Sequence, residues 1–321
     1  MEKFISCDWG TSAFRLRLVE AATQNILAEI KTQQGIAATF AAWKNEQDAN
    51  QFSFYFTILS DSIAMLEKQY GKALTDIPLV VSGMASSSIG MMELPYKEAP
   101  FKADGSDLLV KNILPTLHFK HRILMISGVR SATDAMRGEE TILAGCNATK
   151  EDRESIFIFP GTHSKHVIVN NGIVNDFRTY MTGEMFDLLV NKSVLAASLQ
   201  KADNSYENEM DFYFNKGVLE GAAGNLLSNI FRVRIHQLFH QLDKKQNYHY
   251  LSGLLIGAEL KDIPAKKYTI VHLVSSGVLA QQYIKALHAT GSTNVQYQHA
   301  DAALVYGQSV ICKQHHSTTK K

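Results

Sequence analysis

The sequence contains one local pattern twice, about one domain length apart. A strand-like run leads through residues 8–12 (DWGTS) into alternating apolar residues that end at Leu18. Residues 156–169 repeat this order around the turn 160–164 (PGTHS). A chain of 321 residues has room for two domains of about 150 residues each. The repeat therefore predicts a duplicated α/β fold with two domains, residues 1–150 and 151–321.

Hydrophobic periodicity predicts the elements around the two turns. Short apolar or alternating runs indicate strands, at residues 26–32, 78–82, 123–127 and 268–274. Apolar residues three and four apart indicate helices, at residues 49–69, 136–146, 216–240, 247–260 and 278–290. Asn171-Gly172 stands between two strand-like runs and predicts a hairpin, because both residues tolerate the positive φ of a type I′ turn.

The turns have the chemistry of a nucleotide site. A Gly-Thr turn offers backbone N–H groups and a hydroxyl, and its glycine leaves room for a polyphosphate. Asp8 ends the first strand and is a candidate Mg²⁺ ligand, because this ion prefers carboxylate oxygens and retained waters. Ser276 and Gly277 follow a later strand, where small residues let a purine or ribose approach the backbone. Each pattern alone also fits an ordinary hairpin or helix cap, but their order along the chain favours nucleotide binding.

Composition and charge exclude several other classes. The formal net charge is +1, which argues against non-specific nucleic-acid binding. Cys7, Cys146 and Cys312 are scattered and form neither a disulfide framework nor a metal-binding CxxC pair. The N-terminus lacks a signal-peptide pattern, and no apolar run reaches the ~20 residues that cross a bilayer. The sequence predicts a cytoplasmic protein that contacts no membrane.

Six blocks in the right order resemble the 2-keto-3-deoxygalactonate kinases (2-dehydro-3-deoxygalactonokinases). They are residues 8–12 (DWGTS), 82–84 (SGM), 136–141 (MRGEET), 160–165 (PGTHSK), 175–184 (NDFRTYMTGE) and 251–259 (LSGLLIGAE). That family belongs to the superfamily of actin, hexokinase and the heat-shock chaperone ATPases. The resemblance implies a two-lobed actin-like (ribonuclease H-like) ATPase fold, with mixed five-stranded sheets and an interlobe cleft.

The same resemblance implies an activity. The expected reaction is ATP-dependent phosphorylation of 2-dehydro-3-deoxy-D-galactonate on its terminal 6-hydroxyl, in galactonate catabolism. The expected cofactors are ATP and Mg²⁺, and an aldolase is expected to act on the product. Matching positions give a phosphate- and nucleotide-binding set: Gly10, Thr11, Ser12, Arg15, Gly161, Thr162, His163, Ser276 and Gly277. The strand end at Ser82, Gly83 and Met84 resembles the part that lines the sugar pocket, and Asp8 resembles the Asp that organises magnesium.

The catalytic base is less directly implied. Related sugar kinases have a Gly-Asp pair at the start of the helix leaving the first lobe, and this chain has Gly138-Glu139-Glu140 instead. A carboxylate within hydrogen-bond reach suffices for the role, so Glu139 is the preferred base and Glu140 the second candidate. The substrate carboxylate needs a cation, and the family blocks contain three candidates: Arg137, Lys165 and Arg178.

Two other functions stay open at this point. The chain could phosphorylate another small sugar acid or polyol, because pocket details set the acceptor. It could also be a non-catalytic nucleotide-binding sensor of the same fold, and acceptor-stimulated ATP turnover distinguishes a kinase from a sensor. The sequence leaves a homodimer open.

Overall fold

The computed structural model describes residues 1–46, 50–117, 119–146, 148, 154–201, 208–263 and 270–317. The chain divides into two compact units. The first consists of Met1–Asp152, Asn171–Asp176 and Ala300–Lys321, and the second of Arg153–Asn170 and Phe177–His299. The division that we expected at residues 150 and 151 falls outside the described part of the chain. The expected second domain, residues 151–321, included the C-terminal residues, but in the structure Ala300–Lys321 group with the first unit.

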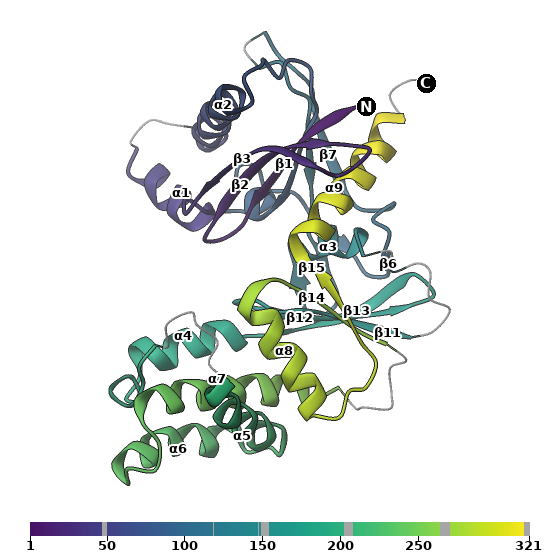
Figure 1. Ribbon diagram of the computed structural model, residues 1–321. Coiled ribbons are helices and arrows are strands. Elements are labelled where there is room, and N and C mark those ends of the chain that lie inside the picture. The colour runs from purple at the N-terminus through teal and green to yellow at the C-terminus, as the bar shows by residue number, and fades with distance from the viewer. Residues whose placement is uncertain are drawn as a thin grey trace. The chain divides into compact units, whose positions relative to one another are not determined.

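The first unit is built on a mixed sheet in the order β3-β2-β1-β4-β8-β7 (Figure 1). Its strands are β1 (Lys3–Trp9), β2 (Phe14–Glu20), β3 (Ile26–Thr32), β4 (Leu79–Gly83), β7 (Val110–Ile113) and β8 (Ile123–Ile126). The first three form an antiparallel meander, whereas β4 and β8 run parallel to β1. At the edge, β7 pairs antiparallel with β8.

The second unit repeats this arrangement in the order β15-β14-β11-β12-β13. Its strands are β11 (Ser155–Phe159), β12 (Ser164–Asn170), β13 (Ile173–Tyr180), β14 (Ile270–Ser275) and β15 (Val295–His299). Again the first strand pairs antiparallel with the second, and the last two run parallel to it. Asn171 and Gly172 have φ angles of 50° and 74°, which confirms the positive φ predicted at this hairpin. The start of β13 lies in the first unit, where it pairs with β6 (Phe101–Lys102).

The shared strand order confirms the duplicated, actin-like fold. Each sheet contains the five expected strands, three antiparallel and two parallel, and each has a sixth strand at one edge, β7 in the first sheet and β6 in the second. A separate small sheet has the order β10-β9-β5, from β5 (Lys97–Glu98), β9 (Val129–Arg130) and β10 (Ala135–Met136). The helix that we predicted from residue 136 therefore begins later, as α3 (Glu139–Ala144), because Met136 belongs to β10.

Two helices that precede β4 in the sequence pack on the first sheet, namely α1 (Ile36–Lys44) and α2 (Gln51–Tyr70). The helix predicted over residues 49–69 is thus confirmed. It begins after Asn50, whose side chain accepts a hydrogen bond from the Ser53 N–H, a common N-cap. It buries Tyr55, Leu59 and Leu66 against the sheet.

The last helix of the chain, α9 (Ala300–Ser317), packs directly on α3 within the first unit. A Cβ atom added at Gly145 would lie 1.8 Å from the Ala303 carbonyl oxygen, and one at Gly307 would lie 1.9 Å from the Thr141 carbonyl oxygen. Only glycine permits so close a backbone contact. Helix α3 is therefore held in place, at Thr141 and at Gly145 after its last residue, by a helix from the opposite end of the sequence.

The helices of the second unit are α4 (Thr182–Lys192), α5 (Asp211–Ala222), α6 (Leu226–Leu238), α7 (Lys244–Leu260) and α8 (Gly277–Ala289). The single helix predicted over residues 216–240 is in fact α5 and α6. The chain turns between them because Gly224 and Asn225 adopt positive φ angles of 101° and 57°. The remaining short helices are η1 (Met84–Ser86), η3 (Ala196–Ser198) and η4 (Asn208–Met210). Among the described helices, none combines the length and the apolar character needed to span a bilayer.

Candidate functional site

Asp8 and Gly83 lie side by side at the carboxyl ends of two neighbouring strands. The parallel register of β1 and β4 pairs Asp8 with Ser82 and Trp9 with Gly83. Gly83 has φ of 86°, and a Cβ atom there would lie 2.8 Å from the Trp9 carbonyl oxygen and 3.6 Å from Asp8 Oδ1. The glycine therefore lets the end of β4 pack closely against the backbone of β1 beside Asp8. Burial raises the pKa of Asp8, against the lowering effect of Arg15 and Arg17.

The first turn of α3 reaches the same place. Gly138 has φ of 118°, and a Cβ atom on it would lie 3.4 Å from Gly83 Cα. Glu139 follows, half-buried, and its charge is close enough to Asp8 to raise the pKa of that carboxyl. The structure thus brings together the candidate metal ligand, the strand end at Gly83 and the preferred base.

Glu140 points elsewhere. Its side chain is 2% exposed, and its two oxygens accept hydrogen bonds from the Gly138 N–H at 2.7 Å and from Thr141 Oγ1 at 2.9 Å. Burial, and then the charge of Glu139, raise the pKa of Glu140 to about 7. The second candidate base is therefore engaged in closing the start of its own helix.

The turn between β1 and β2 carries the candidate phosphate donors. The Gly10 N–H donates to the Ala13 carbonyl at 2.9 Å, and the carbonyls of Gly10 and Thr11 accept hydrogen bonds from the N–H groups of Ile36 and Ala37 at the start of α1. These bonds fix the backbone of the turn. The side chains of Thr11 and Ser12 are exposed.

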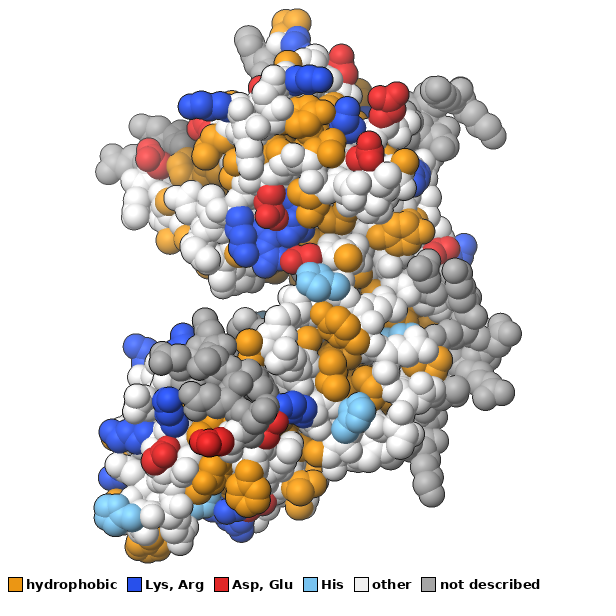
Figure 2. All heavy atoms as spheres, in the orientation of Figure 1, with side chains coloured by type: hydrophobic (Ala, Val, Ile, Leu, Met, Phe, Trp, Pro, Cys, Tyr) orange, Lys and Arg blue, Asp and Glu red, His pale blue; other side chains and the backbone are white. Residues whose placement is uncertain are grey.

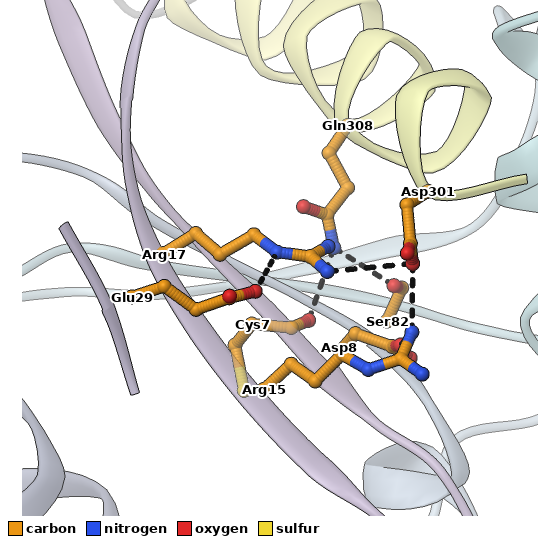
Figure 3. A network of polar contacts seen from close by, with 8 residues as sticks. All are labelled: Cys7, Asp8, Arg15, Arg17, Glu29, Ser82, Asp301 and Gln308. Carbon is orange, nitrogen blue, oxygen red and sulfur yellow. Dashed lines mark hydrogen bonds and ion pairs between the residues drawn. The ribbon is translucent and has the colours of Figure 1, made fainter. Parts of the chain in front are cut away.

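Arg15 stands opposite Asp8 in the β1–β2 ladder and belongs to a network of charges (Figure 3). Its Nη1 atom lies 2.7 Å from Asp301 Oδ1 and 3.5 Å from Asp8 Oδ2. Arg17 is 4% exposed, with its Nε atom 2.6 Å from Glu29 Oε1 and its Nη2 atom 3.3 Å from Asp301 Oδ1. Figure 2 shows basic side chains gathered next to acidic ones on the upper half of the molecule as drawn, which is the first unit. Arg15 is therefore held beside Asp8 chiefly by Asp301.

The predicted sugar-binding residues of the first unit have different surroundings. Ser82 is 1% exposed, and its hydroxyl accepts a hydrogen bond from Gln308 Nε2 at 2.8 Å. Met84 is half-buried against the core of the unit. Arg137 stacks on the Tyr96 ring, with its Cζ atom 4.2 Å from the ring centroid, and its Nη1 atom donates to the Ser86 carbonyl at 2.6 Å and hydroxyl at 2.7 Å. Arg137 is thus held in one orientation.

In the second unit, the turn after β11 packs against the start of α4. A Cβ atom on Gly183 would lie 2.5 Å from the Gly161 carbonyl oxygen, and the Glu184 N–H donates to the Thr162 carbonyl at 3.0 Å. Gly161 itself has no atom within 4 Å of an added Cβ, so its outer side is open. His163 is exposed, and its Nε2 atom lies 2.5 Å from Glu184 Oε2.

The two remaining cation candidates also lie in the second unit. Lys165 is 5% exposed, and its Nζ atom donates to the His163 carbonyl at 3.2 Å. This buried side chain therefore stabilises the turn at residues 160–164. Arg178 is exposed on β13, where it hydrogen-bonds Tyr180. The three candidate cations are therefore divided between the units, with Arg137 in the first.

A pocket of about 160 Å³ opens next to the Gly161 turn, within the second unit. Its lining includes Gly161, Thr182, Phe186, Tyr248, Ser252, Leu255, Leu279, Gln282 and Tyr283. Ser276 is at the N-cap position of α8 without a side-chain capping bond, and Gly277 begins the helix two residues before the lining residue Leu279. Ser276 and Gly277 are exposed, and no atom lies within 4 Å of a Cβ atom added at Gly277. The lining is mostly apolar with a few polar groups, which is typical of a small-molecule site.

A buried carboxylate supports the wall of this pocket. Glu259 is 3% exposed, and it accepts hydrogen bonds from the Tyr283 hydroxyl at 2.6 Å and from the Thr182 hydroxyl. His166 Nε2 lies 2.8 Å from its other oxygen. Glu259 thus fixes two lining side chains.

Sequence reasoning missed Asp301, Gln308 and Glu259 as parts of these sites. Asp301 and Arg15 are 286 residues apart, and an acidic residue in the first turn of a helix is ordinary. Glu259 does fall in the family block 251–259, but nothing in the block separates it from its core neighbours. The described residues contain no group of three or more His, Cys, Asp or Glu side chains that could hold a metal ion.

Comparisons with known proteins agree on one family. The family model described as 2-keto-3-deoxy-galactonokinase matches residues 8–311. The 2-dehydro-3-deoxygalactonokinase of Escherichia coli (strain K12) is 34% identical over 224 residues, which cover 67% of this chain and 71% of that protein. A Rhizobium meliloti (strain 1021) protein provisionally given the same name is 30% identical over 315 residues, covering 97% of this chain and 96% of its own.

A solved structure agrees with this result. A crystal structure from Sinorhizobium meliloti, provisionally described as a 2-dehydro-3-deoxygalactonokinase, superposes with a TM-score of 0.80 at 30% identity. The match covers 97% of this chain and 96% of that one. The similarity therefore extends over both units.

Proposed function

The chain belongs to the 2-keto-3-deoxy-galactonokinase family and is a carbohydrate kinase, and on that premise we propose how its residues serve the reaction. The reaction is transfer of the terminal phosphoryl group of ATP to the 6-hydroxyl of 2-dehydro-3-deoxy-D-galactonate. It would take place in the cytoplasm, as a step of galactonate catabolism, and an aldolase would act on the product.

The observation that carries the proposal is the grouping of Asp8, Gly83 and Glu139 in the first unit. The reaction needs a carboxylate for a metal ion and a second carboxylate for the acceptor proton. Asp8 and Glu139 supply them, and the absence of a Cβ atom at Gly83 and Gly138 lets the strand ends and the start of α3 pack closely enough to bring the two together. The strand end at residues 82–84 would receive the sugar acid.

Mg²⁺ fits at Asp8. One carboxylate, with phosphate oxygens and retained waters, is a common way for proteins to hold this ion. The Asp8 side chain is 25% exposed, so its carboxylate is accessible at the end of β1. When bound, the ion would neutralise part of the charge on the phosphates.

Glu139 is the proposed general base. A base must reach the acceptor hydroxyl, and Glu139 is half-buried near Asp8, whereas both oxygens of Glu140 are engaged within α3. Arg137 is the proposed partner of the substrate carboxylate, because it lies in the first unit with the strand end and is already oriented by Ser86 and Tyr96. Pre-orientation reduces the entropy lost on binding.

Each unit has its own candidate groups for the nucleotide. In the first unit, Thr11, Ser12 and Arg15 would donate to its phosphates. In the second, the open side of the Gly161-Thr162 turn would do the same, with His163 beside it, while the adjoining pocket and the start of α8 at Ser276 and Gly277 would take the nucleoside. The Lys165 ammonium donates to the His163 carbonyl within the turn. We therefore propose that Lys165 stabilises the conformation of this turn and does not bind the sugar acid.

The test is coupled ADP release with ATP and Mg²⁺ against a panel of acceptors. The panel contains 2-keto-3-deoxygalactonate, 2-keto-3-deoxygluconate, glycerol and several pentuloses. Strong turnover on the galacto keto acid alone supports the proposal. Turnover on another member of the panel would reassign the acceptor, and ATP binding without stimulation by any acceptor would favour a nucleotide sensor.

A further inference from the structure

Helix α9 places two polar side chains at the edge of the first sheet that carries Asp8 and Gly83 (Figure 3). This helix comes from the other end of the chain. Asp301 and Gln308 are seven residues apart, about two helical turns, so they lie on the same side of α9. Gln308 Nε2 donates to the Cys7 carbonyl at 3.0 Å and to Ser82 Oγ at 2.8 Å. These are the residues immediately before Asp8 and Gly83, and one buried amide therefore ties together the ends of both strands.

Asp301 determines where the Arg15 guanidinium lies. Arg15 Nη1 is 2.7 Å from Asp301 Oδ1 but 3.5 Å from Asp8 Oδ2, so Asp301 is the closer partner of the two. Without Asp301, Arg15 could move from 3.5 Å to hydrogen-bonding distance of Asp8 and occupy the carboxylate proposed to hold Mg²⁺. The attraction between the two carboxylates and Arg15 is stronger than between fully exposed charges, because all three side chains are partly shielded from water.

The rest of the network keeps Asp301 itself in place. Arg17 lies between Glu29 and Asp301, is almost fully buried and has little freedom to move. The helix that carries Asp301 is held against α3 at Gly145 and Gly307, where the two backbones touch. An acidic residue in a first helical turn is common, but this one lies on a rigid helix and contacts two arginines.

We propose that Asp301 is a positioning residue for phosphoryl transfer. It holds Arg15 beside Asp8, in the orientation in which Arg15 binds the terminal phosphate of the nucleotide. It also keeps Arg15 from neutralising Asp8. This inference rests on the proposed function and adds to it a residue that touches neither nucleotide nor sugar acid.

The experiment compares Asp301→Asn, Asp301→Glu, Arg15→Ala and the double variant Asp301→Asn/Arg15→Ala with the unaltered full-length protein. Glu98→Gln is the matched control, because it also removes one carboxylate paired with an arginine, on the exposed β5–β9 ribbon of the same unit. The readouts are kcat, the KM for each substrate, thermal unfolding, and calorimetric binding of a non-hydrolysable ATP analogue with Mg²⁺ and of ADP with Mg²⁺.

We expect Asp301→Asn to lower kcat by about 10- to 100-fold, the loss typical of a displaced catalytic group. It should weaken the ATP analogue more than ADP, because Arg15 serves the terminal phosphate, and leave the KM of the sugar acid unchanged. Asp301→Glu should recover part of the loss, and Glu98→Gln should resemble the unaltered protein. In the double variant, the Asp301 substitution should add little to the loss from Arg15→Ala, because both act through one guanidinium.

Unchanged kcat and analogue affinity in Asp301→Asn would overturn the proposal. Losses that add fully to those of Arg15→Ala would also overturn it, as would equal weakening of the ATP analogue and ADP. If the unaltered protein phosphorylates no acceptor in the panel, the proposed function fails separately. A selective loss of analogue affinity in Asp301→Asn would still support the positioning of Arg15.

Discussion

Glu140→Gln should make the protein more stable at neutral and alkaline pH while leaving it active. The side chain is 2% exposed, and burial raises its pKa from 4.5 to about 7. Between these two values the folded protein holds a proton on Glu140 that the unfolded chain has released. The free energy of unfolding therefore falls as the pH rises through this range.

The size of the effect follows from the pKa shift. One pKa unit corresponds to about 1.4 kcal/mol, so a shift from 4.5 to about 7 amounts to roughly 3 kcal/mol. Glutamine has no charge to bury, and its amide can still meet the Gly138 N–H and the Thr141 hydroxyl. The stability of the variant relative to the unaltered protein should thus rise by about 3 kcal/mol between pH 4.5 and pH 8.

Urea unfolding at several pH values measures this difference directly, with coupled ADP release measured on the same samples. Glu139→Gln is the comparison, because Glu139 is half-buried at the adjacent position. It should abolish most of the turnover and keep the part of the pH dependence that comes from the burial of Glu140, which is the larger cause of its raised pKa. A Glu140→Gln protein whose relative stability does not change with pH would refute the assigned pKa. A Glu140→Gln protein that folds but is inactive, beside an active Glu139→Gln, would reverse the assignment of the base.

Three further substitutions test the site. Asp8→Asn should lower turnover by at least about 100-fold without loss of fold, because burial already disfavours the charged form; full activity in the folded variant would remove Asp8 from the mechanism. Gly83→Ala should reduce the unfolding free energy by about 2–3 kcal/mol, since its Cβ atom would lie 2.8 Å from the Trp9 carbonyl oxygen at a positive φ. Gly71→Ala has similar φ but lies in the left-handed helical region, with ψ of 12° in place of −150°, and has no atom nearby. Its cost in urea unfolding should be only about 1 kcal/mol, and equal costs would contradict the combined effect of the clash and the backbone strain at Gly83. Gly161→Val should fold normally but bind ATP at least about 10-fold more weakly in calorimetry, and unchanged affinity would place the phosphates elsewhere.

Much of the fold could be predicted from local patterns. The strand-turn-strand repeat, the hairpin at Asn171-Gly172 and the helix over residues 49–69 depend on side-chain periodicity and on the φ preferences of single residues. These preferences act over a few residues, so they can be read from a short stretch of sequence. The same patterns failed at residues 136 and 224–225, where a short strand and two positive φ angles interrupt an apolar spacing that otherwise fits a helix.

The local pattern of the sequence indicated Asp8 at the end of the first strand, and the resemblance to the kinase family added Gly83 and the two glutamates as candidates. The difference between Glu139 and Glu140 was decided only by the tertiary structure, because neighbouring residues on a helix point in directions about 100° apart and their surroundings come from other elements. The burial of Lys165 beneath the turn at residues 160–164 was likewise decided by the tertiary structure, because the residues that cover it come from other elements.

Asp301 and Gln308 depended entirely on the folded chain. Their partners lie 286 and 301 residues away, and only the return of α9 to the first unit brings them together. No local preference encodes such a contact, because it depends on the path of the whole chain and on the packing of α9 against α3. The sequence by itself thus determined the repeated strands and turns and the chemistry they carry, and the tertiary structure decided which side chains hold that chemistry in place.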